Sequence, residues 1–202
     1  MRADSGEYPP SPQKADSGEY PQSPPSVLLY HGSDVAIEHP DVILNTGFSD
    51  LGQGFYLTDD HDAACRRAAS RARRTAAAAG VVSVFELITE GLPWVTWGQN
   101  IDGLATPYGL TFSDDLAGIT AWLEYLAACR RGKSALGNLG EPAIVRAWIA
   151  TEEAEMVSSG LIEAQEAADY IDPSELIVQY CVRDQAVADA RLRFVRSEIV
   201  EG

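Results

Sequence analysis

Long apolar runs are missing from this chain of 202 residues. No stretch approaches the roughly 20 residues that a membrane-spanning helix requires, and the N-terminus lacks the basic and apolar segments of a classical secretory signal. We therefore expect no membrane partner. The expected location is the cytoplasm, or the cytoplasm of a host or target cell that the protein reaches by a non-classical secretion route.

Cysteine is also scarce, because the chain contains only three. Cys65, Cys129 and Cys181 are far apart in the sequence, and each lies among apolar residues. A disulfide framework or a zinc site needs more cysteines at closer spacings. The pattern predicts reduced, structural thiols and no metal site.

Basic residues are outnumbered: 15 Lys and Arg face 30 Asp and Glu, a net charge of −15. A field of this sign repels phosphate backbones, so nucleic acid is an unfavourable partner, whereas a basic protein would be attracted. Five arginines nevertheless follow three aspartates on one predicted helix: Asp59, Asp60 and Asp62, then Arg66, Arg67, Arg71, Arg73 and Arg74. Because the helix dipole favours acids first and bases last, we interpret this cluster as chiefly structural.

The first 26 residues differ in composition from the rest. ADSGEYP occurs at 3–9 and again at 15–21, within a segment rich in Pro, Ser, Gly and charge. Such a segment has little to bury and is typical of a disordered tail. It would serve as a linker, a partner-binding peptide or part of an uncleaved export signal. The remainder, 27–202, is long enough for one domain with its own core.

Within this domain, segments typical of strands and of helices are mixed without a regular alternation. Strands are predicted at 27–32, 54–58, 81–88, 143–150, 175–182 and 192–200. Helices are predicted from residue 58 or 59 to near Gly80, within 111–132, and over 152–169. The second helix places one apolar face toward the core, formed by Leu116, Ile119, Leu123, Leu126 and Cys129. The irregular order favours an α+β fold over a doubly wound sheet.

Three polar residues interrupt the predicted strands. His31 ends the first strand, Tyr56 follows Gly52 and Gly54 in the second, and Gln179 lies in the middle of ELIVQYCV. A buried amide without a partner costs about 1–3 kcal/mol, so Gln179 either bonds to its neighbours or faces a cleft. Each residue taken alone is more simply explained by a structural role.

Taken together, three segments resemble the ADP-ribosyltransferases of the histidine–tyrosine–glutamate class, which includes diphtheria toxin and the poly-ADP-ribose polymerases. The segments are LYHGSD, DLGQGFYLTDDHDAACRRAA and ELIVQYCVRDQA, in that order. The resemblance is closer to a bacterial family described as domain of unknown function 3990. Two middle segments, AWLEYLAACR and AIVRAWIATEE, are also similar to that family, so the resemblance covers most of 28–195.

The resemblance implies a split β-sandwich, with two packed antiparallel sheets, surrounding helices and NAD in the cleft between the sheets. His31 would bond a ribose hydroxyl, the backbone of Gly32 would pair with the nicotinamide amide, and Tyr56 would stack on the nicotinamide ring. The cofactor-binding set that it implies is His31, Gly32, Ser33, Gly54, Phe55, Tyr56 and Arg66, with Arg67 as an alternative to Arg66 at the pyrophosphate. The loop 169–174 would lie where relatives contact their targets.

The chain departs from that class at its third motif, where Gln179 occupies the position of the glutamate. Glu175, four residues earlier, remains a second candidate. Cleavage of the nicotinamide–ribose bond develops positive charge on the ribose. A glutamate stabilises that charge, whereas a glutamine can only orient the sugar, so we expect a slower enzyme and a single transfer.

The expected function is therefore mono-ADP-ribosyl transfer, with NAD consumed as co-substrate and with Gln179, Tyr56 and His31 as the catalytic residues. The target would be a protein or another macromolecule, and the protein would act as a bacterial toxin or effector, with a cognate antitoxin or an activating partner. Two alternatives remain open. One is an NAD glycohydrolase toxin that uses water as acceptor, and the other is a catalytically silent module that binds NAD or ADP-ribose.

Overall fold

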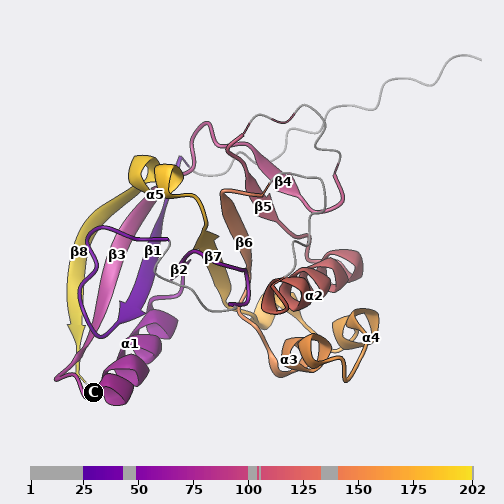
Figure 1. The fold of residues 1–202 in the computed structure, drawn as a ribbon, viewed down its shortest axis with the longest axis horizontal. Helices are drawn as coiled ribbons and strands as arrows, with labels where there is room; N and C mark the ends of the chain where they lie inside the picture. The colour runs from indigo at the N-terminus through magenta and orange to yellow at the C-terminus, as the bar shows by residue number, and fades with distance from the viewer. Residues whose placement is uncertain (1–24, 43–48, 100–103, 105, 133–140, 202) are drawn as a thin grey trace, which may run out of the picture.

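The computed structural model describes residues 25–42, 49–99, 104, 106–132 and 141–201, and the predicted repeats of the tail lie outside them (Figure 1). The described residues form an α+β fold, as predicted. The strands are β1 (Ser26–Ser33), β2 (Phe55–Thr58), β3 (Gly80–Ile88), β4 (Trp94–Thr96), β5 (Gly109–Thr111), β6 (Ile144–Trp148), β7 (Val178–Val182) and β8 (Leu192–Val200). The helices are α1 (His61–Thr75), α2 (Leu116–Arg130), α3 (Glu152–Ser159), α4 (Ala164–Ala168) and α5 (Gln185–Arg191), with a 3-10 turn, η1 (Pro173–Glu175).

All eight strands belong to one open sheet, in the order β4-β5-β6-β7-β2-β1-β3-β8. The pairs β4·β5 and β5·β6 are parallel, and the other pairs are antiparallel. The expectation of two separate antiparallel sheets is corrected here, because one residue pair, Tyr30 with Thr58, joins β1 to β2. By contrast, β1 pairs with β3 from Ser26 to Ser33. The sheet is therefore continuous but narrowest at the β1–β2 junction.

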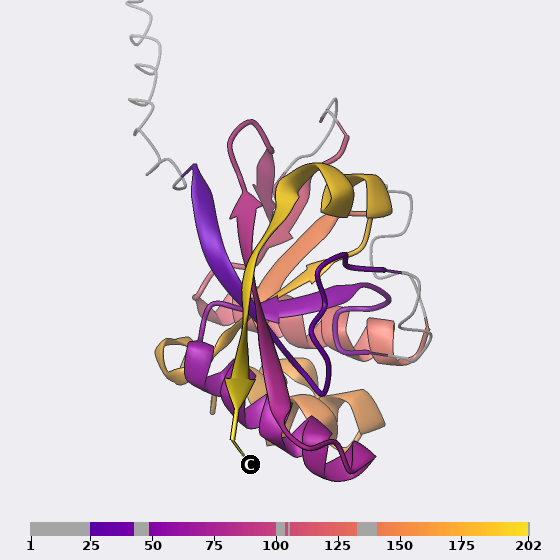
Figure 2. The same ribbon diagram turned by 90° about the vertical axis from the view of Figure 1, so that its left-hand side faces the viewer.

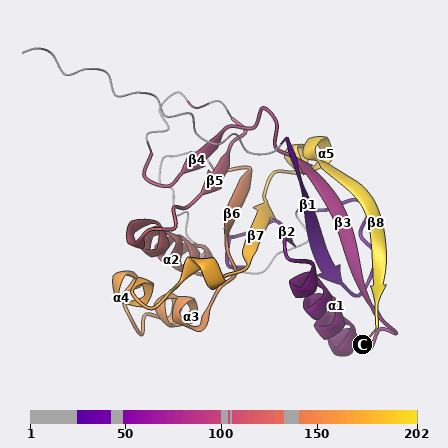
Figure 3. The ribbon, with the colours of Figure 1, turned by 180° about the vertical axis from the view of Figure 1, so that it is seen from behind.

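The helices form separate groups along the sheet: α1 lies beside β1 and β3, and α2, α3 and α4 lie together beside the other half, which contains β6 and β7 (Figures 1 and 3). Helix α1 packs on β1 and β3, while α3 and α4 pack on α2 beside the other half. Small residues on α1 allow its close approach: Ala64, Ala68 and Ala72 are buried. Among the described residues, no helix combines the length and apolar character needed to cross a bilayer.

The charges at the two ends of α1 follow the order that the helix dipole favours. The Asp60 side chain accepts a hydrogen bond from the Ala63 N–H and caps the helix, and Asp62 lies in the first turn. Arg73 and Arg74 lie in the last turn. The helix ends well before Gly80, because Ala76 adopts the left-handed conformation at φ 55°.

Three predicted elements differ from the structure. The helix predicted over 152–169 is divided into α3 and α4, since Gly160 (φ 75°) ends α3. The buried residues of α2 extend beyond the one predicted apolar face, because α3 and α4 also pack against this helix. Its Leu116, assigned to the buried face, is 45% exposed. Strand β7 begins at Val178, after η1.

The first strand starts slightly before the predicted domain boundary. Ser26 already pairs with Ile88, and the Pro25 carbonyl accepts hydrogen bonds from the N–H groups of Thr89 and Glu90. Residues 25 and 26 therefore belong to the folded sheet.

Candidate functional site

The β1–β2 junction holds most of the predicted site residues and divides them between the two faces of the sheet. Side chains alternate along a strand, and residues paired across strands share a face. Thr58 pairs with both Tyr30 and Gln179, so these three share one face, and Tyr56 lies two residues before Thr58. We call this the α1 face, because α1 packs on it. His31 follows Tyr30 and projects from the opposite face.

His31 connects the two halves of the sheet. Its Nδ1 lies 2.7 Å from the Tyr56 carbonyl oxygen, and its ring stacks on Phe55 at 4.5 Å between ring centres. Burial lowers the pKa of His31; the bond to the carbonyl opposes this shift, and Arg67 and Arg71 add to it. Because a carbonyl only accepts hydrogen bonds, Nδ1 carries the proton, and the lowered pKa favours the neutral ring at pH 7. Nε2 is then an acceptor with no partner among the residues that the structure describes.

Gly32 lies directly beneath α1. A Cβ added to it would be 2.1 Å from the Ala64 carbonyl oxygen and 2.8 Å from the Ala68 nitrogen. Both are backbone atoms, so a rotated side chain would not relieve the contact. The absence of a side chain after His31 is therefore explained by helix packing, without a ligand.

Tyr56 is held by its own loop. Its hydroxyl donates to the Gly52 carbonyl at 2.5 Å and accepts from the Leu51 N–H at 3.0 Å. Burial raises the pKa of Tyr56 far above its ordinary value. The ring packs partly buried against the core around α2. Tyr56 therefore has a structural role in any case, and only its ring is available to a ligand.

Gln179 lies in the same cross-strand row as Thr58 and Ala147. The side chain is half-buried, and its Oε1 is fully buried with no hydrogen-bond partner among the described residues. The neighbouring hydroxyl of Thr58 donates instead to the Val178 carbonyl. An acceptor buried without a partner is unfavourable by about 1–3 kcal/mol. Gln179 is thus an unsatisfied group on the α1 face, one strand away from Tyr56.

The arginines of α1 divide into two groups. Arg67 and Arg71 lie close enough to His31 to lower its pKa, and the Arg67 Cβ is 3.0 Å from where a Gly32 Cβ would be. Arg71 also contacts Asp34 at 3.4 Å. All three are exposed, but the charge of Arg66 acts on Cys65 instead, where it opposes the rise in pKa that burial causes. Of the two arginines considered for the pyrophosphate, Arg67 is the one beside β1.

The remaining predicted cofactor residues are engaged in packing. The Ser33 side chain is buried and donates to the Asp34 carboxylate at 3.1 Å. A Cβ on Gly54 would be 2.5 Å from the Cys181 Sγ, so this glycine permits the contact between β2 and β7. Phe55 is buried and supports the His31 ring. No other role is visible for these three residues.

Glu175, the alternative to Gln179, is exposed and lies in η1, outside the strands of the sheet. The loop 169–174 precedes it, and Tyr170 in this loop is 75% exposed. The even spacing of Glu175 and Gln179 does not place them on one strand face, because β7 begins only at Val178.

Sequence reasoning missed Arg146, whose side chain lies on the same face as His31. Its Nε donates to the Tyr180 hydroxyl at 3.2 Å, and the positive charge of Arg146 opposes the burial that raises the pKa of Asp59. The available signal was a charged residue in the middle of the apolar strand AIVRAWIA.

The other polar clusters offer no cofactor site of their own. Within the described ranges, no group of three or more His, Cys, Asp or Glu side chains is arranged to hold a metal ion. All three cysteines are free; Cys129 and Cys181 are buried, and Cys65 is half-buried beside His61.

Comparison with known proteins gives one match. No curated protein and no solved structure matches the chain significantly. Residues 27–102, which include His31, Tyr56 and α1 but not Gln179, match the family described as "Protein of unknown function (DUF3990)".

Proposed function

We propose that the protein is an NAD-dependent mono-ADP-ribosyltransferase whose nicotinamide–ribose end binds on the α1 face of the β1–β2 junction. The observation that supports this most is the buried, unpartnered Oε1 of Gln179, in the row next to Tyr56. A ribose hydroxyl would donate a hydrogen bond to this oxygen. The Tyr56 ring, fixed through its hydroxyl, offers a flat surface for a planar heterocycle.

His31 would act through the Tyr56 backbone, and two arginines of α1 would act on another part of NAD. His31 lies on the opposite face, so its first role is to hold the Tyr56 backbone against β1 through Nδ1. The expected bond from His31 to a ribose hydroxyl is replaced by this positioning role, because the His31 ring lies on the face opposite Tyr56 and Gln179. Arg67 and Arg71 provide positive charge beside β1 in a chain of net charge −15, which favours a pyrophosphate there.

The proposed reaction is a substitution at the ribose carbon that carries nicotinamide. The nicotinamide–ribose bond breaks, and nicotinamide leaves with the electron pair. The acceptor nucleophile then forms its bond to the same carbon and loses its proton. Gln179 remains neutral throughout, so it positions the sugar and contributes less charge stabilisation than a carboxylate. Hydrogen bonds to charged groups contribute about 1.5–3 kcal/mol, against about 0.5–1.5 for neutral ones. A slow, single transfer follows from this difference.

The acceptor is proposed to be a protein, and the setting that of a bacterial toxin or effector. The acidic surface attracts basic proteins and repels nucleic acid.

The test is incubation of the purified protein with NAD labelled in its adenylate half and with cell lysate. We expect label on a protein band, together with release of nicotinamide. Label found only in free ADP-ribose would indicate a glycohydrolase and contradict transfer. Binding of NAD without cleavage would indicate a silent binding module and contradict both enzymatic proposals.

A further inference from the structure

Strand β8 forms one edge of the sheet and is paired on one side only. It follows β3 from Leu192 opposite Leu87 to Val200 opposite Gly80. It is the outermost element at the left of Figure 1 and at the right of Figure 3, and it faces the viewer in Figure 2. No described element pairs with its outer side. A long unpaired edge is a template for another strand.

The sequence of this edge is complementary to itself when read in the opposite direction. Residues 193–201 are RFVRSEIVE, with Ser197 at the centre. In an antiparallel pair of two such strands centred on Ser197, Arg196 of one copy faces Glu198 of the other. Val195 of one copy comes near Ile199 of the other, and these two apolar side chains are 47% and 79% exposed. Opposite charges and apolar residues that face each other across strands stabilise pairing.

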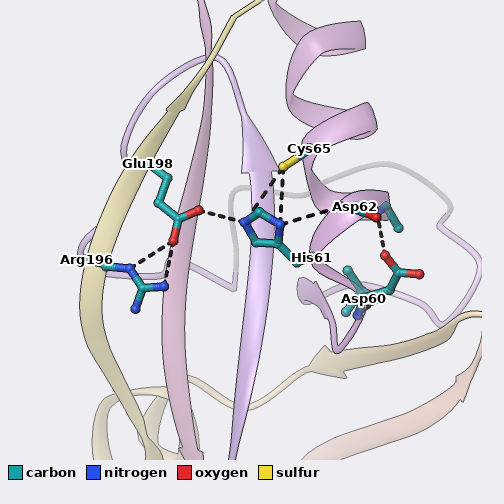
Figure 4. A network of polar contacts seen from close by, with 8 residues as sticks. Asp60, His61, Asp62, Cys65, Arg196 and Glu198 are labelled. Carbon is teal, nitrogen blue, oxygen red and sulfur yellow. Dashed lines mark hydrogen bonds and ion pairs between the residues drawn. The ribbon is translucent and has the colours of Figure 1, made fainter.

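The charged pair is already positioned on one face. Arg196 pairs with Val84 and Glu198 with Val82, so both lie on the α1 face. Figure 4 shows Glu198 between two partners: Oε2 is 2.7 Å from His61 Nε2, and Oε1 is 2.7 Å from the Arg196 guanidinium. A two-fold axis normal to the sheet keeps this face common to both copies. Each Glu198 would then also meet the Arg196 of the other copy.

The local geometry limits regular pairing to the residues around Ser197. The register shifts between Val84 and Phe85, so Val195 is an extra residue and the alternation is regular from Arg196 onward. Helix α1 packs mainly on β1 and β3, on the inner side of β8, and leaves the outer side of β8 accessible (Figure 1). The residues around Ser197 are therefore the part of β8 that fits a second strand.

We propose that two copies of this chain form a dimer by antiparallel pairing of β8 about Ser197, which extends the sheet from one protomer into the other. The partner is a second copy, because the pattern that fits this edge is the edge itself. The arrangement is independent of the function proposed above.

Cysteine cross-linking tests the register. Only a residue on the two-fold axis meets its own copy, and directly opposite residues have Cα atoms about 4.5–5.5 Å apart, within disulfide range. Oxidised Ser197→Cys should run as a covalent dimer. In Val195→Cys the two thiols would be about 13 Å apart along the strands, so it should remain monomeric. Wild type is the control for the native Cys65. Equal cross-linking of both variants, or none in Ser197→Cys, would overturn the proposal.

Exchanging the charges at positions 196 and 198 tests whether the partner is a second copy of this chain. Arg196→Glu and Glu198→Arg each place like charges opposite each other, so each alone should lose the dimer. An equimolar mixture of the two variants restores opposite charges across the interface, and it should dimerise although neither variant does so alone. Arg74→Glu, an equal charge change on exposed α1, should leave the dimer intact.

Sedimentation of the full chain over a range of concentrations gives the basic result. We expect a concentration-dependent species of twice the 21.8 kDa monomer. A monomer at every concentration, or a dimer that both single charge variants retain, would overturn the proposal.

Discussion

Replacing Gly32 by alanine distinguishes helix packing from ligand contact as the reason for this glycine. The added Cβ would be 2.1 Å from the Ala64 carbonyl oxygen, whereas non-bonded contacts to carbon are favourable near 3.5–4.0 Å. Helix α1 would therefore have to withdraw by about 1 Å or more. Substitutions that overpack a well-filled site cost about 1–3 kcal/mol. Each kcal/mol lowers Tm by about 2–4 °C for a domain of this size, so we expect a fall of about 2–12 °C.

Calorimetry without NAD measures this effect, with Gly80→Ala as the matched control. A Cβ on Gly80 would be 2.6 Å from the carbonyl carbon of Ala68, so it too would contact α1. Gly80 lies in β3 and is not a neighbour of His31 in the sequence. Both variants should therefore lose stability, and Gly80→Ala should bind NAD as wild type does once folded. If Gly32→Ala kept the wild-type Tm and lost only NAD binding, the packing explanation would be wrong.

Three further predictions follow from the site. Burial lowers the pKa of His31 below 6.5, so at acidic pH the unfolded chain binds a proton at His31 more readily than the folded protein does. Stability should fall as the pH drops below about 6.5, and thermal scans at several pH values should show a smaller fall for His31→Gln. Tyr56→Phe removes the partner of the Leu51 N–H and should cost about 1–3 kcal/mol in urea unfolding, while NAD affinity measured by calorimetry changes little because the ring remains. In NAD-cleavage assays, Gln179→Ala should lose far more rate than affinity, and Gln179→Glu should retain or gain rate. Loss of activity in a folded Glu175→Gln variant, with the activity of Gln179→Ala unaffected, would identify Glu175 as the catalytic residue in place of Gln179.

Much of the fold was predictable because its signals are local. The strands around Leu29, Val84 and Ile144 are apolar runs, and the acids and arginines of α1 mark the two ends of that helix. Gly160 could have indicated the break between α3 and α4, but a glycine in a helical pattern does not by itself end a helix. Strands β4 and β5 have three residues each and carry too little periodicity to be recognised.

The sequence supplied candidate residues for the site, but not their arrangement. The sequence singled out His31, Tyr56 and Gln179 as candidates, yet the face from which each projects depends on the single pair between Tyr30 and Thr58. The same limit applies to Arg67, since only the packing of α1 on Gly32 distinguishes it from its neighbour Arg66. Register and helix packing are long-range properties that one sequence does not reveal.

The most direct test of the proposed function is the release of nicotinamide from NAD by wild type and by Gln179→Ala, with NAD affinity measured for both. We predict that wild type releases nicotinamide, and that Gln179→Ala binds NAD with similar affinity but releases much less. If wild type released no nicotinamide, or if Gln179→Ala released it at the wild-type rate, the assignment of this site would be contradicted.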